Sequence, residues 1–224
     1  MKVLLETTTA EIVEKKSRFI ANVFYVENEN EAVNRLNEIR KKYYDAKHNC
    51  YAYILGKNGE SMKSSDDGEP QGTAGHPMLD ILKGENLTNC IAIVTRYFGG
   101  TLLGTGGLVR AYSESLKAAV KNAKFSNIYD GFEVDFSVNY DDFGKVENIV
   151  QNINQDVNDD SFSPIISLDK SFTENVTLKY LIDKSEFNKF KQNINNLTKG
   201  KVILEDNDNK TYYIKDKKIV YINV

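Results

Sequence analysis

The spacing of apolar residues predicts a strand followed by a helix near the start of the chain. Residues 17–24 alternate between apolar and polar side chains, which is typical of a β-strand. A helix is expected to open at Asn28, because Glu31 stands three residues later at the spacing of a capping box. The apolar stripe of this helix comprises Ala32, Leu36, Ile39 and Tyr43.

Two nearly continuous apolar runs, residues 48–55 and 89–96, predict central strands of a sheet. A short helix is expected between them, with Pro77 in its first turn and Gly84 at its C-terminal cap. A longer helix is expected to begin near Gly107, where apolar residues recur at helical spacing. These residues are Leu108, Val109, Tyr112, Leu116, Ala119 and Ala123.

The pattern restarts after a linker at residues 127–130 and predicts a second unit of strands and helices. Strands are expected at residues 132–138, 163–168, 176–182 and 201–205, with one helix over residues 143–153 and another led by Ser185. This βαββαβ order is that of a ferredoxin-like split sandwich, and a β-hairpin turning at residues 215–218 follows it. The sequence therefore predicts an α+β protein with two domains, residues 1–127 and 128–224.

Composition narrows the class of protein. The chain has 224 residues, of which 41% are hydrophobic, and it contains no run long enough to span a membrane and no signal-peptide pattern. Cys50 and Cys90 lie in apolar runs, so we expect buried, reduced thiols and a cytoplasmic protein.

The two halves of the chain differ in charge. Residues 1–127 hold 17 Lys and Arg against 15 Asp and Glu, whereas residues 128–224 hold 12 Lys and Arg against 17 Asp and Glu. Neither half is basic enough to predict nucleic-acid binding from charge alone, so such binding would depend on a local patch.

A glycine-rich stretch between residues 96 and 110 predicts an anion-binding site. The strand ends at Arg96, and free backbone N–H groups would converge where the next helix begins, which favours phosphate or carboxylate. Arg110 near that helix start opposes the helix dipole unless an anion is present. The alternative is that Arg110 pairs with Glu114 and that the glycines serve tight packing. The candidate anion-binding residues are Arg96, Gly99, Gly100, Gly104, Thr105, Gly106, Gly107 and Arg110.

The spacing of these glycines fits neither of two common nucleotide-binding motifs. No Gly-Lys-Ser/Thr follows them, which excludes a nucleoside-triphosphate P-loop. Residues 104–107 also lack the spacing of a dinucleotide fingerprint, and no acidic residue stands at the distance where the ribose would be bound.

A second glycine-containing stretch carries the carboxylates Asp66, Asp67 and Glu69. They could hold a divalent cation or act as general acid and base, but Gly68 and Pro70 indicate an acidic turn, which we favour. The candidate residues lining a cleft are Asp66, Asp67, Glu69, Thr73 and His76. The spacing of the two histidines and two cysteines resembles no zinc module. We therefore assign no catalytic residue, no metal and no cofactor.

Three stretches, residues 48–53, 66–75 and 96–112, together resemble the IMPACT family in its bacterial, YigZ-type form. The resemblance covers most of residues 1–127. It implies that the first domain shares its fold with the second domain of a small-subunit ribosomal protein, domain IV of elongation factor G, MutL and the GHMP kinases. It also implies a second domain like the last domain of elongation factor G. Some members carry a lysine at the position of Leu102, so one positive charge of the anion site is absent here.

The resemblance adds a biological context to the anion site, because eukaryotic relatives are tied to translational control. The leading hypothesis is a non-enzymatic cytoplasmic protein that binds RNA or a ribosome-associated partner and takes part in the regulation of translation. Arg96, Arg110 and the backbone of residues 99–107 would contact phosphates. One rival is an enzyme or small-molecule phosphate binder whose acidic turn holds a metal. A third hypothesis is a protein-interaction module that docks through its acidic second domain.

Overall fold

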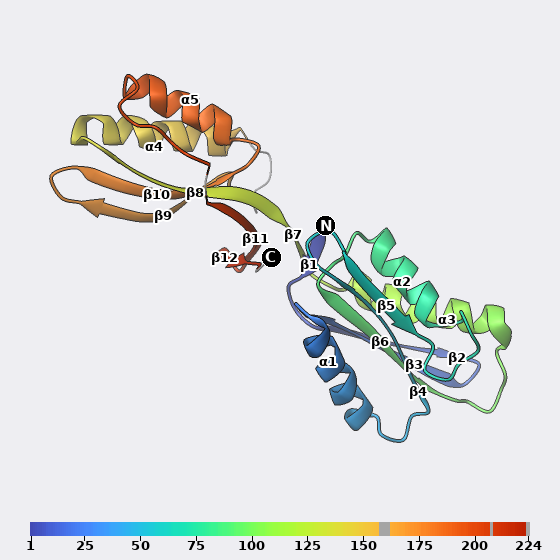
Figure 1. The fold of residues 1–224 in the computed structure, drawn as a ribbon. Helices are drawn as coiled ribbons and strands as arrows, with labels where there is room; N and C mark the ends of the chain where they lie inside the picture. The colour runs from blue at the N-terminus through green and yellow to red at the C-terminus, as the bar shows by residue number, and fades with distance from the viewer. Residues whose placement is uncertain (157–161, 207, 223–224) are drawn as a thin grey trace. The chain divides into compact units, whose positions relative to one another are not determined.

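The computed structural model describes residues 1–156, 162–206 and 208–222, which form two compact units (Figure 1). The first unit spans residues 1–127 and the second begins at Ile128. Each unit has its own sheet and its own apolar core, so each is described by itself. The mixture of sheets and helices agrees with the predicted α+β class.

The first unit is built on a five-stranded antiparallel sheet in the order β2-β3-β6-β4-β5. Its strands are β2 Thr8–Glu14, β3 Ser17–Tyr25, β4 His48–Leu55, β5 Ser61–Ser65 and β6 Cys90–Tyr97. The short strands β1 Lys2–Leu4 and β7 Phe125–Asn127 pair with each other beside it. The strands predicted at residues 17–24, 48–55 and 89–96 are confirmed, and all three lie inside the sheet rather than at its edges.

Helices cover both faces of this sheet and make three layers (Figure 1). Helix α1 Glu29–Lys42 packs on one face, against Tyr53 and Ile93 among others. Helices α2 Gly75–Gly84 and α3 Gly104–Lys121 pack on the other face, over Phe19 and Val94. Burial on both faces explains why β4 and β6 are apolar almost throughout. None of the helices in the described part is long and apolar enough to cross a membrane.

Helix ends follow the sequence in one case and depart from it in two. Asn28 caps α1 as predicted, because its side chain accepts the Glu31 N–H at 3.0 Å. Gly84 is the last helical residue of α2 rather than its cap, and the chain turns at Asn86, whose φ is 59°. Helix α3 begins at Gly104, three residues before the predicted start at Gly107.

The second unit has the predicted βαββαβ order, with a hairpin at its end. Its sheet runs β12-β11-β8-β10-β9, and two helices pack on one face (Figure 1). The elements are β8 Tyr129–Val138, α4 Tyr140–Gln155, β9 Ile165–Phe172, β10 Val176–Asp183, α5 Phe187–Leu197, β11 Asn209–Lys215 and β12 Lys218–Tyr221. The hairpin turns through Asp216 and Lys217, whose φ angles of 49° and 62° suit a two-residue turn.

The strand predicted at residues 201–205 is wrong, and β11 takes its place as the fourth strand. The alternation that suggested a strand is present, since Leu204 is buried in the core and Ile203 is 76% exposed. The segment, however, has no strand pairing with β8, which β11 joins only from Asn209 onward. Alternating burial therefore arose here without a ladder of hydrogen bonds.

Candidate functional site

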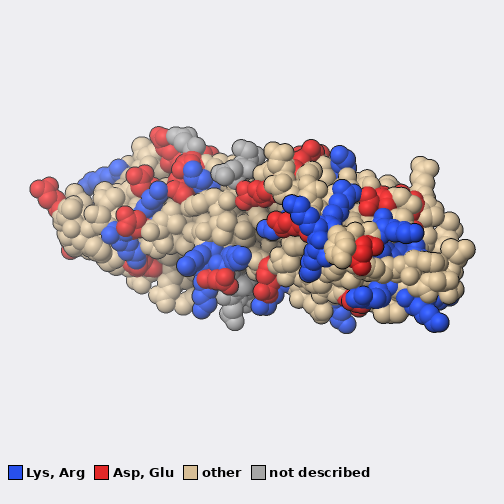
Figure 2. All heavy atoms as spheres, turned by 90° about the horizontal axis from the view of Figure 1, so that it is seen from below, with Lys and Arg blue, Asp and Glu red and all other residues tan. Residues whose placement is uncertain are grey.

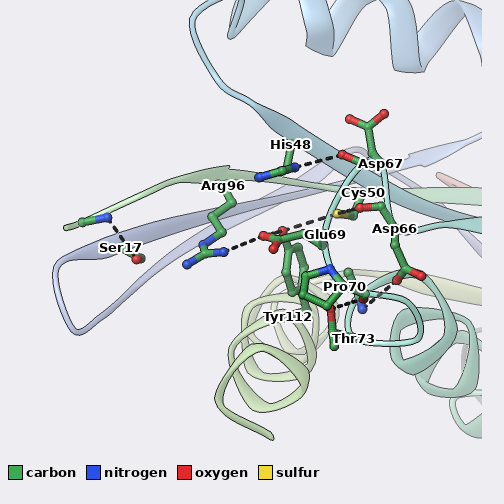
Figure 3. A network of polar contacts seen from close by, with 12 residues as sticks. Ser17, His48, Cys50, Asp66, Asp67, Glu69, Pro70, Thr73, Arg96 and Tyr112 are labelled. Carbon is green, nitrogen blue, oxygen red and sulfur yellow. Dashed lines mark hydrogen bonds and ion pairs between the residues drawn. The ribbon is translucent and has the colours of Figure 1, made fainter. Parts of the chain in front are cut away.

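A buried ion pair joins the two glycine-containing stretches of the first unit (Figure 3). Glu69 Oε1 accepts a hydrogen bond from Arg96 Nη1 at 2.7 Å and another from the Tyr112 hydroxyl at 2.8 Å. The side chains of Arg96 and Glu69 are only 8% and 4% exposed. Two buried charges in contact stabilise each other only as a pair, so neither is available to an outside ligand without large cost.

The environment of Arg96 is aromatic as well as ionic. Its guanidinium lies 5.4 Å from the ring centroid of Phe19 and 5.7 Å from that of Phe98. The phosphate contact predicted for Arg96 stays a prediction, and its pairing with Glu69 gives it a structural role first. Sequence reasoning missed the part of Tyr112, because its place in the apolar stripe of α3 hides the hydroxyl that reaches Glu69.

Burial holds the Tyr112 phenol and both thiols of the first unit in their protonated forms. Cys50 Sγ lies 3.3 Å from the Tyr112 hydroxyl and 2.9 Å from the carbonyl oxygen of Asp66. Burial raises the pKa of both Cys50 and Tyr112 well above the ordinary range, and it raises the pKa of Cys90 to about 12. Both cysteines are free and buried, as predicted. A thiol kept protonated is a poor nucleophile, so this arrangement does not favour covalent catalysis.

The acidic turn uses its carboxylates for structure. Asp66 accepts the N–H groups of Gly72, Ala74 and Gly75 at 2.8–2.9 Å, which ties the loop to the start of α2. Burial alone would raise the pKa of Asp66, but these three N–H donors outweigh it and hold the pKa below its usual value.

Asp67 faces a different set of donors. Its carboxylate accepts the Asn49 N–H and a guanidinium N–H of Arg40, each at 2.7 Å. The Asp67 backbone carbonyl oxygen lies 2.9 Å from His48 Nδ1. Asp66, Asp67 and Glu69 therefore each bond to a separate set of donors, and no group of three or more His, Cys, Asp and Glu in the described residues could hold a metal ion. The geometry agrees with the acidic-turn interpretation.

The remaining residues predicted to line a cleft are divided between interior and surface. Thr73 is buried, and its hydroxyl donates to the Pro70 carbonyl at 2.6 Å (Figure 3). His76 is exposed in the first turn of α2. The structure therefore brings Glu69 and Thr73 into the packed loop and leaves His76 outside it.

The glycines of the second stretch have different reasons to be glycine. A side chain at Gly99 would overlap the backbone of Lys16, and the Gly99 N–H donates to Ser17 Oγ at 3.1 Å. Gly100 and Gly104 have φ angles of 84° and 71°, which favour glycine. Gly106 has neither reason, because its φ is ordinary and an added Cβ would meet nothing within 4 Å.

The N-terminus of α3 presents free donors to solvent. Leu103 at the N-cap makes no side-chain hydrogen bond, and the first turn contains no acidic residue. Gly104, Thr105 and Gly106 are exposed. An uncapped, exposed first turn points its backbone N–H groups at whatever lies beyond it, and the helix dipole favours an anion there.

Arg110 stands one turn after Gly106 and has no hydrogen-bond or ion-pair partner among the described residues. The alternative pairing with Glu114 is not formed, because Glu114 pairs with Lys117 at 3.1 Å. Since α3 begins at Gly104, Arg110 lies in the second turn, where the dipole acts less strongly than we expected. Helical side chains tilt toward the N-terminus, so we expect Arg110 to lean toward the preceding turn, which contains Gly106 and Gly107.

Two large apolar side chains flank this helix start. Phe98 is 57% exposed and Leu102 is 84% exposed. On the face shown in Figure 2, Lys and Arg are interspersed with Asp and Glu. The local features at the start of α3, rather than a broad basic face in that view, distinguish the candidate anion site.

Comparison with known proteins identifies the family. Residues 15–120 match the model of the Impact N-terminal domain. The chain is 36% identical to the IMPACT family member YvyE of Bacillus subtilis over 198 residues, covering 88% of this chain and 87% of that protein. It is 43% identical to the IMPACT family member YigZ of Escherichia coli, over 48% of this chain and 53% of that protein.

A solved structure is similar to this chain over most of its length. The structure is a crystal structure of a hypothetical protein. The match covers 91% of this chain and 95% of the other chain, with 27% sequence identity and a TM-score of 0.57. The chain belongs to the IMPACT family, and its relatives include the bacterial YigZ and YvyE proteins.

Proposed function

We propose that this chain is an RNA- or ribosome-associated binding protein that takes part in the regulation of translation, and that the start of α3 holds a phosphate. The observations that carry the proposal are the uncapped N-terminus of α3 and, in its second turn, an exposed Arg110 with no partner among the described residues. A helix N-terminus and a guanidinium together bind phosphate through N–H donors and opposite charge.

The residues have separate roles in this proposal. Arg110 and the backbone N–H groups of Gly104 and Gly106 contact the phosphate, while the absent side chain of Gly106 allows close approach. Arg96 positions the loop through its ion pair with Glu69. The fold likeness to a ribosomal protein domain and to elongation factor G, implied by the family resemblance, belongs to the same proposal.

The test compares two exposed cations on the same helix. Arg110→Ala removes the proposed contact, whereas Lys121→Ala removes an exposed cation in the last turn of α3. Binding to purified ribosomes and to a 16-nucleotide unstructured RNA is measured across a salt series. We expect Arg110→Ala to weaken binding about tenfold, equivalent to roughly 1.4 kcal/mol, and to reduce the salt slope by about one. Lys121→Ala should match the parent.

An Arg110→Ala variant that melts like the parent and binds both probes equally well would contradict the proposal. The rival small-molecule hypothesis is favoured by one observation, the small charge excess of 17 basic over 15 acidic residues in residues 1–127. Few RNA phosphates could be neutralised by so little charge. If inorganic phosphate binds with Arg110-dependent affinity while RNA and ribosomes do not bind, the small-ligand function is preferred.

A further inference from the structure

One half of strand β8 lacks a hydrogen-bonded neighbour on its outer side. Strand β10 pairs with β8 all along Gly131–Val138, but β11 pairs with it only at Tyr129–Phe132. One further hydrogen bond on the β11 side of β8 joins the Glu133 N–H to the Asp208 carbonyl oxygen at 3.0 Å. Beyond Glu133, the outer side of β8 has no strand in the described part of the chain.

The backbone groups left open can be assigned to two residues. In an antiparallel strand, alternate residues direct their N–H and C=O groups toward opposite neighbours. Because the Glu133 N–H points to the β11 side, the groups of Asp135 and Ser137 point to that side as well. Neither residue has a backbone hydrogen bond there to any described residue. Two N–H and two C=O groups of β8 are therefore without a partner in the described part of the chain, and we infer that they can pair with an added strand.

The segment that precedes β11 lies alongside this edge without filling it. A hollow of about 330 Å³ remains, lined by Glu133 and Asp135 of β8 and by Leu204, Glu205 and Asp208 of the segment. A loop over an edge ordinarily protects it from pairing with other chains. Here the covering segment is anchored by buried Leu204 yet leaves open space next to the unpaired backbone. An open edge of this kind is a template for an added strand.

The charge of the hollow indicates what kind of strand it accepts. Four carboxylates line it, those of Glu133, Asp135, Glu205 and Asp208. Lys179 pairs with Glu133 at 2.8 Å and Lys210 pairs with Asp208 at 2.6 Å, whereas Asp135 is exposed and forms no ion pair within the described residues. Asp135 therefore leaves a negative charge at this edge, and residues 128–224 carry 17 acidic against 12 basic residues.

We propose that the unpaired half of β8 binds an extended basic segment of a partner protein, which adds a strand beside Asp135 and Ser137. A second copy of the same edge would set Asp135 near Asp135, and RNA would meet the carboxylates, so both are disfavoured by charge. Backbone hydrogen bonds would provide affinity, and a basic side chain opposite Asp135 would meet its carboxylate. This surface belongs to the second unit and the start of α3 to the first, so the two proposals are tested with different residues.

The first measurement concerns the free protein. Amide hydrogen exchange of the full chain should be fast at Asp135 and Ser137 and slow at Val134 and Phe136, whose N–H groups face β10. Slow exchange at all four amides would mean that residues 201–205 already pair with β8 in solution, and it would overturn the proposal.

The second measurement uses a capped hexapeptide of alternating lysine and valine. We expect saturable binding, with exchange at Asp135 and Ser137 slowed when the peptide is present. A peptide N-methylated at the lysines, which lie opposite Asp135 and Ser137 in an antiparallel pairing, should bind about tenfold more weakly, because it lacks the backbone donors that face β8. Asp135→Lys should weaken binding by a similar factor, while the control Asp169→Lys, at an exposed position of the edge strand β9, should not. Equal binding of the methylated peptide, or no binding of the parent peptide at millimolar concentration, would overturn the proposal.

Discussion

The two glycine-containing loops of the first unit, residues 66–75 and 99–107, use their polar groups in opposite ways. In the first loop, Asp66, Asp67 and Glu69 each accept hydrogen bonds from groups inside the same unit. In the second, the first turn of α3 lacks a side-chain cap, and Arg110 lacks a partner among the described residues. Polar groups that are already satisfied build structure, and exposed unsatisfied groups can bind a ligand.

This difference means that a dense motif is not in itself a binding site. Both loops look equally specialised in the sequence, and only the hydrogen-bond partners distinguish them. The comparison assigns stability to the acidic loop and recognition to the loop that starts α3. Substitutions in the first should change the free energy of unfolding, and substitutions in the second should change binding.

The largest expected effect comes from Glu69→Ala. Removing this carboxylate leaves Arg96 buried without its ion partner, which should lower the free energy of unfolding of the first unit by about 3–5 kcal/mol. Urea denaturation measures the change. The double variant Glu69→Leu with Arg96→Met removes both charges and should recover much of the loss. A single variant within about 0.5 kcal/mol of the parent would show that the pair is not structural.

A smaller effect is expected from Asp66→Ala, which removes the acceptor for three N–H groups at the start of α2. The loss should be about 1–2 kcal/mol at neutral pH, as for a helix cap. The control is Asp80→Ala, since Asp80 is exposed on the same helix.

The lowered pKa of Asp66 predicts how the stability of the first unit depends on pH. The pKa of Asp66 is lowered from its ordinary value of 3.8, so the folded state binds its proton less readily than the unfolded state. Its contribution is therefore fully present above pH 3.8 and is lost as pH falls through the lower folded pKa. Unfolding measured across acid pH should show a weaker pH dependence in Asp66→Ala than in the parent. An unchanged profile would contradict the role assigned to Asp66.

Gly106→Ala should raise stability slightly while weakening binding. Its φ is ordinary and an added Cβ meets nothing within 4 Å, so alanine should stabilise α3 by up to about 1 kcal/mol. The same methyl group would obstruct a phosphate at the helix start. Gly144→Ala is the matched control, because Gly144 also lies in a helix with open space around it. A Gly106→Ala variant that binds RNA and phosphate as the parent does would contradict close approach at this glycine.

Local patterns in the sequence were sufficient for most of the elements. Alternation identified β3, apolar runs identified β4 and β6, and the spacing of Asn28 and Glu31 identified the start of α1. The edge strand β5, Ser61–Ser65, has no such run, because polar residues suffice where one side faces water. At residues 201–205, burial of Leu204 produced the pattern of a strand without the pairing.

The site was less predictable, because its key contacts join residues far apart in sequence. Glu69 and Arg96 were both selected, but as parts of different sites, and their separation by 27 positions gives no local sign of a pair. The sequence also could not predict that Arg110 lacks a partner among the described residues. Glu114 stands at a favourable spacing from Arg110, yet it pairs with Lys117. Choosing among competing partners requires the three-dimensional arrangement of their side chains.

The most direct measurement is a titration of isotope-labelled protein with inorganic phosphate and with a short RNA, followed through backbone amide resonances. The N–H groups of Ala74 and Gly75 already bond to Asp66, whereas those of the first turn of α3 are uncapped. We therefore predict saturable shifts at Gly104, Thr105 and Gly106, reduced in Arg110→Ala, with Ala74 and Gly75 unaffected. Shifts confined to other regions, or equal in both loops, would contradict the assignment of recognition to the start of α3.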